Sequence, residues 1–447
     1  MERINLGKLI ENNIGGVTEE DLVEVYNKTR EMIVGSKECS ELLGFSLRGN
    51  KEAENKLKKI IANIMDENDF YVVGKTKQEL FDYLCQNIYG LGPVDELMKD
   101  KDISEIMVNG YGPEEPIIYE KKGFKYKYKY FLDEQQILNT ITRMLYPVGE
   151  TVNEGKCTCE TTLVDGSRLT VVIPPVCLNG PTFTIRRYTS LVLMPEEYIK
   201  MGSGSKEMFE FFKLLSKGKA NILICGGTST GKTTLLRALC TYIPIDERIL
   251  TIEDTEELQL KKLDSERHVL ALLAQKGRVD FSIKDCLILA LRERPDRIIM
   301  GEVRGAASKY LMDGMRTGHE AMGTFHASTP TKAIEELGSE IRTVDPSIDA
   351  EILYNELART FDVIIQLNFF KHLGKRVIVT VAEPVEYINK KLICRNIFKY
   401  TLEGFKFCET ISKDLSEKLL QNNALELLNT PWISDEFTEE EKELYLK

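Results

Sequence analysis

Apolar residues follow three different patterns along the chain. Over residues 1–88 they recur every three to four positions between charged faces, which predicts helices. Over residues 89–200 the apolar runs are shorter and are separated by turn residues, which predicts a small α+β domain. Over residues 201–400 strand-like runs alternate with helical ones, so a parallel sheet covered by helices is expected. Residues 401–447 are expected to end in an acidic helical tail around Glu439, Glu440 and Glu441, which is solvated or serves as a docking surface.

Two local patterns refine this division. The stretch Met201-Gly202-Ser203-Gly204-Ser205 has the composition of a flexible linker, so a hinge is expected there.

Lysine and tyrosine alternate between Lys125 and Tyr130, which places them on opposite faces of a strand. Tyrosines stacking on nucleic-acid bases is one interpretation of this alternation. An edge strand with a solvated lysine face is the simpler interpretation and is preferred.

The composition narrows the class of protein. A chain of 447 residues is long enough for two or three domains, and 43% hydrophobic with 29% charged residues is the balance of a globular protein. The formal net charge of −11 disfavours nucleic acid as a partner. Ten cysteines without a zinc-ligand spacing favour a reducing cytosol. We find no signal peptide and no apolar run long enough to span a bilayer, so membrane contact is expected only through partners.

A phosphate-binding loop is the strongest chemical signal. An apolar strand, 221–225, leads into a segment that satisfies the pattern GxxxxGK[ST], and a helical run follows. Inward-turned backbone N–H groups and the helix N-terminus would surround phosphate oxygens, while Lys232 would reach the β- and γ-phosphates of ATP. The Thr233 hydroxyl would ligate Mg²⁺. The residues expected to bind the nucleotide are Gly226, Gly227, Thr228, Ser229, Thr230, Gly231, Lys232, Thr233 and Thr234.

Acidic residues follow the next two predicted strands. The run 248–252 is followed by Glu253 and further acids, and the run 297–300 is followed by Gly301 and Glu302. Carboxyl ends of parallel strands meet at one edge of a sheet, where ligands bind, so both glutamates should face the nucleotide. Glu302 is the candidate that polarises the attacking water. Gly301 stands where the usual Walker B pattern has an aspartate, so the metal would depend on Thr233, phosphate oxygens and waters, with help from Glu253 or Glu302.

Two of the four histidines lie in one short segment, 318–327, around a fourth strand-like run. Such a pair at a strand end suggests a sensor of the γ-phosphate, with His326 as the candidate. His319 is equally well interpreted as a hydrogen-bonded core histidine. Zinc is not expected, because further ligands at a recognisable spacing are missing.

The phosphate loop, the acidic run IEDTEE, the GEVRG strand end and the two-histidine segment occur in the order found in secretion and pilus ATPases. In this respect the chain resembles the type II/type IV secretion superfamily. Segments 90–110, 165–175, 180–190 and 317–329 look like its CpaF branch, which serves tight-adherence (Tad/Flp) pili. The segment VGETVNEGKCTCETTLVDGSR departs from that branch. The similarity covers about residues 88–400.

The resemblance implies an α/β fold: a RecA-like P-loop NTPase core, a preceding smaller α+β domain and a helical N-terminal extension. It implies a homo-oligomer, a hexameric ring, with ATP bound between the two domains. By matching positions, Glu253 is the acidic-box glutamate, Glu302 the catalytic glutamate and His326 the histidine-box residue. The basic positions that reach the phosphates from the α+β domain are Arg168, Arg186 and Arg187.

The sequence therefore predicts an ATP hydrolase that powers pilus assembly or protein secretion, cytoplasmic and peripheral at the inner face of the cytoplasmic membrane. Its expected partners are integral-membrane platform proteins. A conjugation-type secretion ATPase with another substrate is the alternative within the class. A RecA-type nucleic-acid motor shares the core, but the net charge disfavours it. A nucleotide-gated scaffold without turnover is a third interpretation, and the presence of both Glu253 and Glu302 weakens it.

Overall fold

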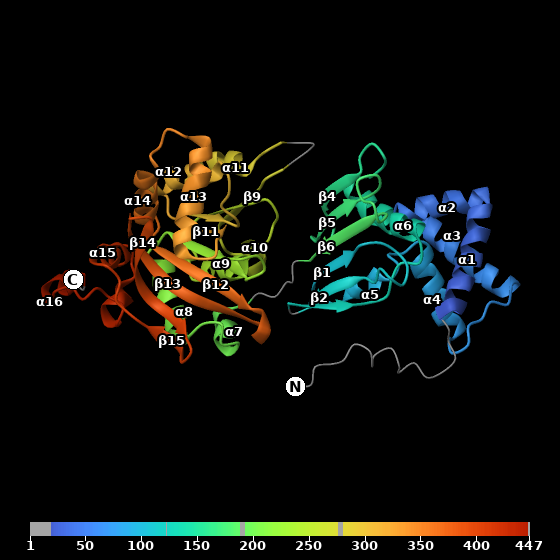
Figure 1. The fold of residues 1–447 in the computed structure, drawn as a ribbon, viewed down its shortest axis with the longest axis horizontal. Coiled ribbons are helices and arrows are strands. Elements are labelled where there is room, and N and C mark those ends of the chain that lie inside the picture. Colours follow the sequence, from blue (N-terminus) through green and yellow to red (C-terminus); the bar gives the residue numbers. More distant parts are fainter. Residues whose placement is uncertain (1–18, 122, 188–192, 276–279, 446–447) are drawn as a thin grey trace. The chain divides into compact units, whose positions relative to one another are not determined.

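The computed structural model describes residues 19–121, 123–187, 193–275 and 280–445. The chain divides into two compact units, Met1–Ser190 and Leu191–Lys447, each with its own hydrophobic cores (Figure 1). The division falls before the boundary expected at residue 201, and the helical and α+β regions expected on either side of residue 88 belong to one unit.

The first unit begins with four amphipathic helices. Their apolar faces meet in one core that includes Tyr26, Leu57 and Leu84. The last helix starts with a capping box, in which Thr76 and Glu79 satisfy each other's backbone N–H groups. The expected helical region is thus present. The helices are α1 (Glu19–Gly35), α2 (Lys37–Leu47), α3 (Lys51–Glu67) and α4 (Lys77–Ile88).

An antiparallel sheet of six strands, ordered β3-β2-β1-β6-β5-β4, forms the rest of the first unit. Its strands are β1 (Ile103–Val108), β2 (Ile118–Lys121), β3 (Phe124–Lys127), β4 (Thr158–Thr162), β5 (Arg168–Val172) and β6 (Thr182–Arg186). Its helices are α5 (Val94–Lys99), α6 (Glu134–Leu145) and η2 (Tyr146–Val148). The lysine–tyrosine alternation lies partly on β3, an exposed edge strand, as the simpler interpretation predicts.

Buried polar contacts join the four helices to this sheet region. The Gln136 side chain of α6 donates to Oδ1 of Asn87 at 2.6 Å, and Arg143 of α6 pairs with Glu54 of α3. These contacts explain why the two regions form one compact unit and not two domains.

A nine-stranded sheet, ordered β15-β14-β13-β12-β7-β11-β10-β8-β9, organises the second unit. Neighbours from β12 to β9 are parallel, as the alternating pattern predicts, and β12 to β15 add an antiparallel side. The strands are β7 (Ile222–Gly226), β8 (Ile249–Glu253), β9 (Val269–Leu273), β10 (Arg297–Met300), β11 (Ala321–His326), β12 (Val363–Phe370), β13 (Lys375–Ile388), β14 (Lys391–Thr401) and β15 (Gly404–Phe407).

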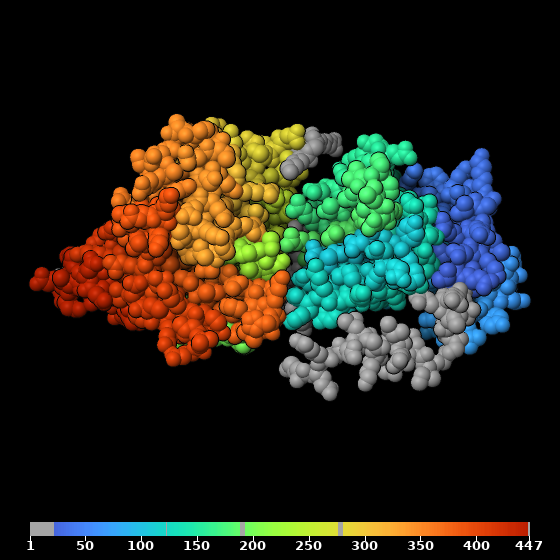
Figure 2. All heavy atoms as spheres, in the orientation of Figure 1, coloured from blue at the N-terminus to red at the C-terminus, as the bar shows by residue number. Residues whose placement is uncertain are grey.

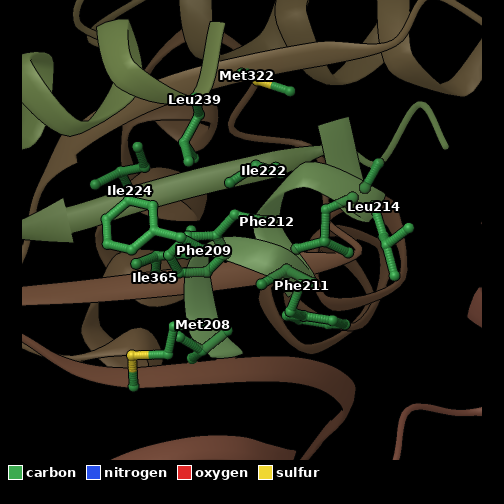
Figure 3. Packing of buried hydrophobic residues seen from close by; sticks show 14 of the residues in the cluster. Met208, Phe209, Phe211, Phe212, Leu214, Ile222, Ile224, Leu239, Met322 and Ile365 are labelled. Carbon is green, nitrogen blue, oxygen red and sulfur yellow. The ribbon is translucent and has the colours of Figure 1, made fainter. Parts of the chain in front are cut away.

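Side chains alternate between the two faces of each strand, so both faces of this sheet carry apolar residues, and helices cover both. Along β7, Ile222 and Ile224 join one core, and Leu223 and Cys225 join the other. Figure 3 shows the first core, where Phe212 of α8 lies close to Ile224. The helices are α7 (Pro195–Lys200), α8 (Lys206–Lys217), α9 (Lys232–Cys240), α10 (Leu260–Leu263), α11 (Ile283–Ala290), α12 (Ala307–Arg316), α13 (Pro330–Val344), α14 (Ala350–Thr360), η3 (Lys371–Leu373), α15 (Lys413–Gln421), η4 (Leu425–Asn429) and α16 (Glu439–Leu444).

The C-terminal segment 401–447 is only in part an acidic helical tail: α16 carries Glu439, Glu440 and Glu441 and has no buried residues, as expected, but residues before it are folded into the second unit. The hairpin of β14 and β15 crosses the expected boundary at residue 401. Beyond it, Leu415, Leu419 and Trp432 are buried in the first core. In the space-filling view this segment, in red, lies against the rest of the second unit (Figure 2).

The expected hinge at residues 201–205 is also part of the folded second unit. Ser203 is buried, and its carbonyl accepts a hydrogen bond from the Ile378 N–H of β13 at 2.9 Å. The hinge expectation is wrong for this segment, because a residue that is paired to a core strand cannot act as a free linker. Among the described residues, we find no helix with the length and apolar character needed to cross a membrane.

Candidate active site

The phosphate loop joins β7 to α9 with the expected geometry. Gly226 ends β7, and a side chain there would lie 2.7 Å from both the Leu367 carbonyl oxygen and the Thr230 hydroxyl, so the strand exit requires glycine. Gly227, Thr228 and Ser229 are exposed, which leaves the loop open to a ligand. No side chain caps the N-terminus of α9, so its first N–H groups point to a site that suits an anion.

Lys232, the first residue of α9, points its ammonium group into this loop. Its Nζ donates hydrogen bonds to the carbonyl oxygens of Gly226 and Gly227, at 3.1 and 2.9 Å. The same Nζ lies 3.2 Å from Nδ1 of His326, at the end of β11. The lysine is buried, and these oxygen and nitrogen atoms stabilise its charge.

Glu302 lies on the other side of His326. Its Oε1 is 4.0 Å from Nε2 of His326, and both side chains are partly exposed. The exit loop of β10 is fastened to β11, because the Val303 N–H donates to the Thr324 carbonyl and the Thr324 hydroxyl donates to the Gly301 carbonyl. Glu302 therefore projects from a fixed backbone at the carboxyl edge of the sheet.

Glu253 occupies the space that Gly301 leaves. A side chain at position 301 would come within 2.9 Å of the Glu253 Cγ, so an aspartate there and the present Glu253 conformation exclude each other. Oε1 of Glu253 accepts hydrogen bonds from the N–H groups of Glu257 and Leu258, at 2.9 and 3.0 Å. Burial raises the pKa of this carboxyl to about 7, against the lowering effect of those two donors.

The residues present fit Mg²⁺ in a particular way. The described residues contain no cluster of three or more His, Cys, Asp or Glu side chains arranged to hold a metal ion. Thr233, near the start of α9, supplies a hydroxyl, and Glu253 supplies a buried carboxylate in place of the missing aspartate. A divalent cation would lower the pKa of Glu253 and stabilise its ionised form. The metal would thus be coordinated by these protein groups together with phosphate oxygens and water.

A cavity of about 200 Å³ adjoins Glu302. Its lining includes Glu302, His326 and Arg304, and also Glu336 and Glu340 of α13. Arg304 pairs with Asp254 at 2.6 Å, which ties the loop after β10 to the acidic run after β8. Glu340 accepts hydrogen bonds from the Gly305 N–H and the Ser308 hydroxyl, so α13 also holds this loop.

Three of the predicted residues are neighbours in one row. The two histidines, His326 and His319, lie in different surroundings. Lys232, His326 and Glu302 are neighbours, and Glu253 ends the strand next to β10. His319 lies at the end of α12, where Nδ1 is 3.3 Å from both the Thr317 hydroxyl and the Gly314 carbonyl oxygen. It is hydrogen-bonded locally, but it is only half-buried, so it is not the core histidine of the alternative interpretation.

The three arginines of the first unit have different surroundings. Arg168 and Arg186 lie directly opposite each other on β5 and β6, and Arg168 has a loose ion pair with Glu160 at 3.8 Å. Arg186 is exposed, and Glu105 of β1 is its partner on the other side. Arg187 donates to the carbonyl oxygens of Leu97 and Asp100 at the end of α5, so its guanidinium is already engaged.

Sequence reasoning missed one cation at the phosphate loop. Arg376 of β13 donates a hydrogen bond from Nε to the Ser229 carbonyl at 2.9 Å. These residues are 147 positions apart, and the contact depends on how the hairpin of β12 and β13 joins the sheet. The only sequence signal is that a strand-like run carries an arginine near its start.

The sequence profile described as "Type II/IV secretion system protein" matches residues 88–367. The chain belongs to this family. The matched span contains the phosphate loop, Glu253, Glu302 and His326, together with the six-stranded sheet of the first unit.

Individual relatives cover different shares of the chain. An uncharacterised protein of Methanocaldococcus jannaschii is 32% identical over 241 residues, which are 52% of this chain and 33% of that protein. The chain spans half of a second relative from the same organism. The type IV secretion system protein VirB11 of Bartonella henselae is 28% identical over 315 residues, 62% of this chain and 87% of VirB11. A putative conjugal transfer protein of Mycobacterium tuberculosis is 26% identical over 298 residues, 64% and 82% of the two chains.

Among solved structures, the Yersinia pseudotuberculosis ATPase DotB is similar to 75% of this chain and to 84% of its own, with 17% identity and a TM-score of 0.48.

Proposed function

We propose that this chain binds Mg²⁺–ATP at its phosphate loop and hydrolyses it to drive a secretion or pilus-assembly machine. The observation that carries the proposal is the row Lys232, His326 and Glu302, with successive separations of 3.2 and 4.0 Å at the edge of a parallel sheet. A phosphate loop with its lysine and a residue that orients the attacking water are two parts that phosphoryl transfer to water uses.

Each residue has a distinct task in this proposal. Lys232 exchanges the two loop carbonyls for the β- and γ-phosphates, because an ammonium binds a phosphate charge more strongly than a neutral oxygen. Glu302 orients and polarises the attacking water from the adjoining cavity. His326 contacts both side chains, so it senses whether Lys232 has moved to the phosphates. Thr233 and Glu253 would hold a bound Mg²⁺, which would supply positive charge to the phosphates.

We propose that arginines of the first unit supply positive charge to the transition state. Arg168 and Arg186 are like charges placed side by side, an arrangement that is unfavourable alone and that an anion relieves. We therefore propose them, ahead of Arg187, as the arginines that reach the γ-phosphate. Arg187 supports them by anchoring the end of β6 to α5.

At the level of the machine, we propose a hexameric ring that acts with integral-membrane platform proteins at the inner face of the cytoplasmic membrane. The CpaF-like segments favour a Tad/Flp pilus as the system served. The relative named for conjugal transfer favours a conjugation-type secretion ATPase as the second candidate. Nucleic acid is not proposed as the substrate, because the net charge is −11.

The test compares His326→Ala with His319→Ala, two substitutions of the same kind on neighbouring segments. Fluorescent-ATP binding and phosphate release are measured on the full chain with Mg²⁺. Lys232→Ala should abolish binding or turnover. His326→Ala should lower turnover at least tenfold, on the order of one lost active-site contact. His319→Ala should leave it unchanged. Normal turnover in Lys232→Ala, or equal losses in both histidine variants, would contradict the proposal.

A further inference from the structure

A β-hairpin extends past the end of the strand that leads into the phosphate loop. Strand β12 pairs with β7 up to Leu367, which lies opposite Gly226. It then continues to Phe370, and β13 returns from Lys375. The tip of the hairpin therefore runs beside the phosphate loop. Phe369 and Arg376 are direct partners across it.

The Arg376 side chain lies along the loop. Its Nε donates to the Ser229 carbonyl at 2.9 Å, and a β-carbon built at Gly231 would touch its Cδ at 3.5 Å. Its guanidinium carbon lies 4.6 Å from the centre of the Phe369 ring, a cation–π distance. Stacking on Phe369 and the bond to Ser229 together fix the guanidinium at the rim of the loop.

Ser229 is the residue of the loop that most needs such support. Its φ is +59°, in the left-handed region that a side chain disfavours. A non-glycine residue in this region is strained, so the loop depends on contacts that hold Ser229 there. A hydrogen bond from a charged donor to the Ser229 carbonyl is such a contact.

We propose that Arg376 is a positioning residue for nucleotide binding: it holds Ser229 in the left-handed conformation and so keeps the phosphate loop ready for its ligand. The inference rests on the proposed nucleotide binding and adds a residue that the loop motif does not contain. Arg376 acts through Ser229 and takes no part in the chemical step.

The test is a thermodynamic cycle on the full chain, with Mg²⁺–ADP binding measured by a fluorescent ADP analogue. Arg376→Ala should raise the Kd about tenfold, the effect of one charge-assisted hydrogen bond. Ser229→Gly alone should change the Kd less than about twofold, because glycine adopts the positive φ at no steric cost. In the Arg376→Ala background, Ser229→Gly should restore the Kd to within about twofold of wild type.

Two further measurements separate this role from general damage. Arg376→Gln retains an N–H donor without the charge, so its Kd should lie between those of wild type and Arg376→Ala. At saturating ATP, kcat of Arg376→Ala should stay within about threefold of wild type while KM rises, as for a residue that supports binding only. Arg395→Ala is the matched control, because Arg395 lies on the next strand, β14, and pairs with Glu436 at 3.5 Å. Its Kd should be unchanged.

The outcomes are distinguishable. A wild-type Kd in Arg376→Ala, while Lys232→Ala fails to bind, would overturn the inference and leave the proposed function standing. A raised Kd that Ser229→Gly does not restore would also overturn it, because Arg376 would then contact the nucleotide directly. If wild type itself binds no nucleotide, the proposed function fails.

Discussion

Glu253→Gln is expected to stabilise the nucleotide-free protein at pH 8. Burial raises the pKa of Glu253 from its ordinary value of 4.5 to about 7, so the folded chain retains a proton that the unfolded chain releases. Between pH 4.5 and about pH 7 the native state binds more protons than the unfolded state, so the free energy of unfolding falls as the pH rises. Above pH 7 the loss amounts to about 3 kcal/mol.

Glutamine removes this loss and keeps the local contacts. Its Oε1 still accepts the N–H groups of Glu257 and Leu258, so the variant imitates the protonated carboxyl. We expect the variant to be more stable than wild type by about 2 kcal/mol at pH 8, and the difference to vanish towards pH 5. Turnover should fall in the same variant, because the buried carboxylate is no longer available to the metal.

Urea unfolding at pH 5, 6, 7 and 8, followed by circular dichroism, measures the difference. Glu256→Gln is the control, since Glu256 belongs to the same loop, pairs with Lys262 at 3.4 Å on the surface, and makes the smallest of the contributions that raise the pKa of Glu253. It should change stability by less than about 0.5 kcal/mol at every pH. A Glu253→Gln variant that is less stable than wild type at pH 8, or a difference independent of pH, would refute the reasoning.

Three other outcomes are expected. Lys418→Met should lower the free energy of unfolding by roughly 2 kcal/mol, because it leaves the half-buried Asp362 without its cation, whereas the exposed pair of Lys442 and Glu439 can be broken at little cost; chemical denaturation compares the two, and equal losses would contradict the account. Arg186→Ala should lower kcat more than it weakens ATP binding. Arg187→Ala should also lower the melting temperature, because it removes the contacts at the end of α5. An unchanged melting temperature in Arg187→Ala would argue against the anchoring role of Arg187. Turnover per chain should rise with protein concentration as rings assemble, which light scattering and phosphate release follow together; full activity in a strictly monomeric sample would rule out the ring.

The contiguous parts of the site were predictable from sequence. The phosphate loop is a short motif between a strand and a helix, and Glu253 and Glu302 follow apolar runs that form β8 and β10. Because parallel strands end at one edge, residues that follow them could be expected to converge. The contact between Lys232 and His326 obeys the same rule, since β7 and β11 are neighbours.

Contacts that depend on long-range pairing were not predictable. Arg376 reaches Ser229 only because β12 joins the parallel sheet beside β7, and a single sequence does not reveal which strands pair. Arg187 resembled a phosphate-binding arginine, yet it caps α5. Residues from 401 onward were assigned to one acidic tail, but of the helices described there only α16 lacks buried residues, and the buried apolar positions Leu415, Leu419 and Trp432 before it were missed.

The hydrogen bond between Ser203 and Ile378 was also not predictable, because it too joins segments that are far apart in the sequence. Glycine and serine composition predicts a flexible linker, but the β13 strand that holds this segment lies far along the chain. Local composition therefore placed the hinge in a segment that the second unit holds in place.

The most direct test of the central claim is a single-turnover experiment with Glu302→Gln. Excess protein is mixed with radiolabelled Mg²⁺–ATP, and bound nucleotide and released phosphate are measured over time. Glutamine keeps the shape of Glu302 but cannot polarise water, so we expect ATP to bind as in wild type and phosphate to form at least a hundredfold more slowly, on the order of the loss of a general base. Phosphate formation at the wild-type rate in this variant would contradict the assignment of Glu302 and, with it, the proposed mechanism.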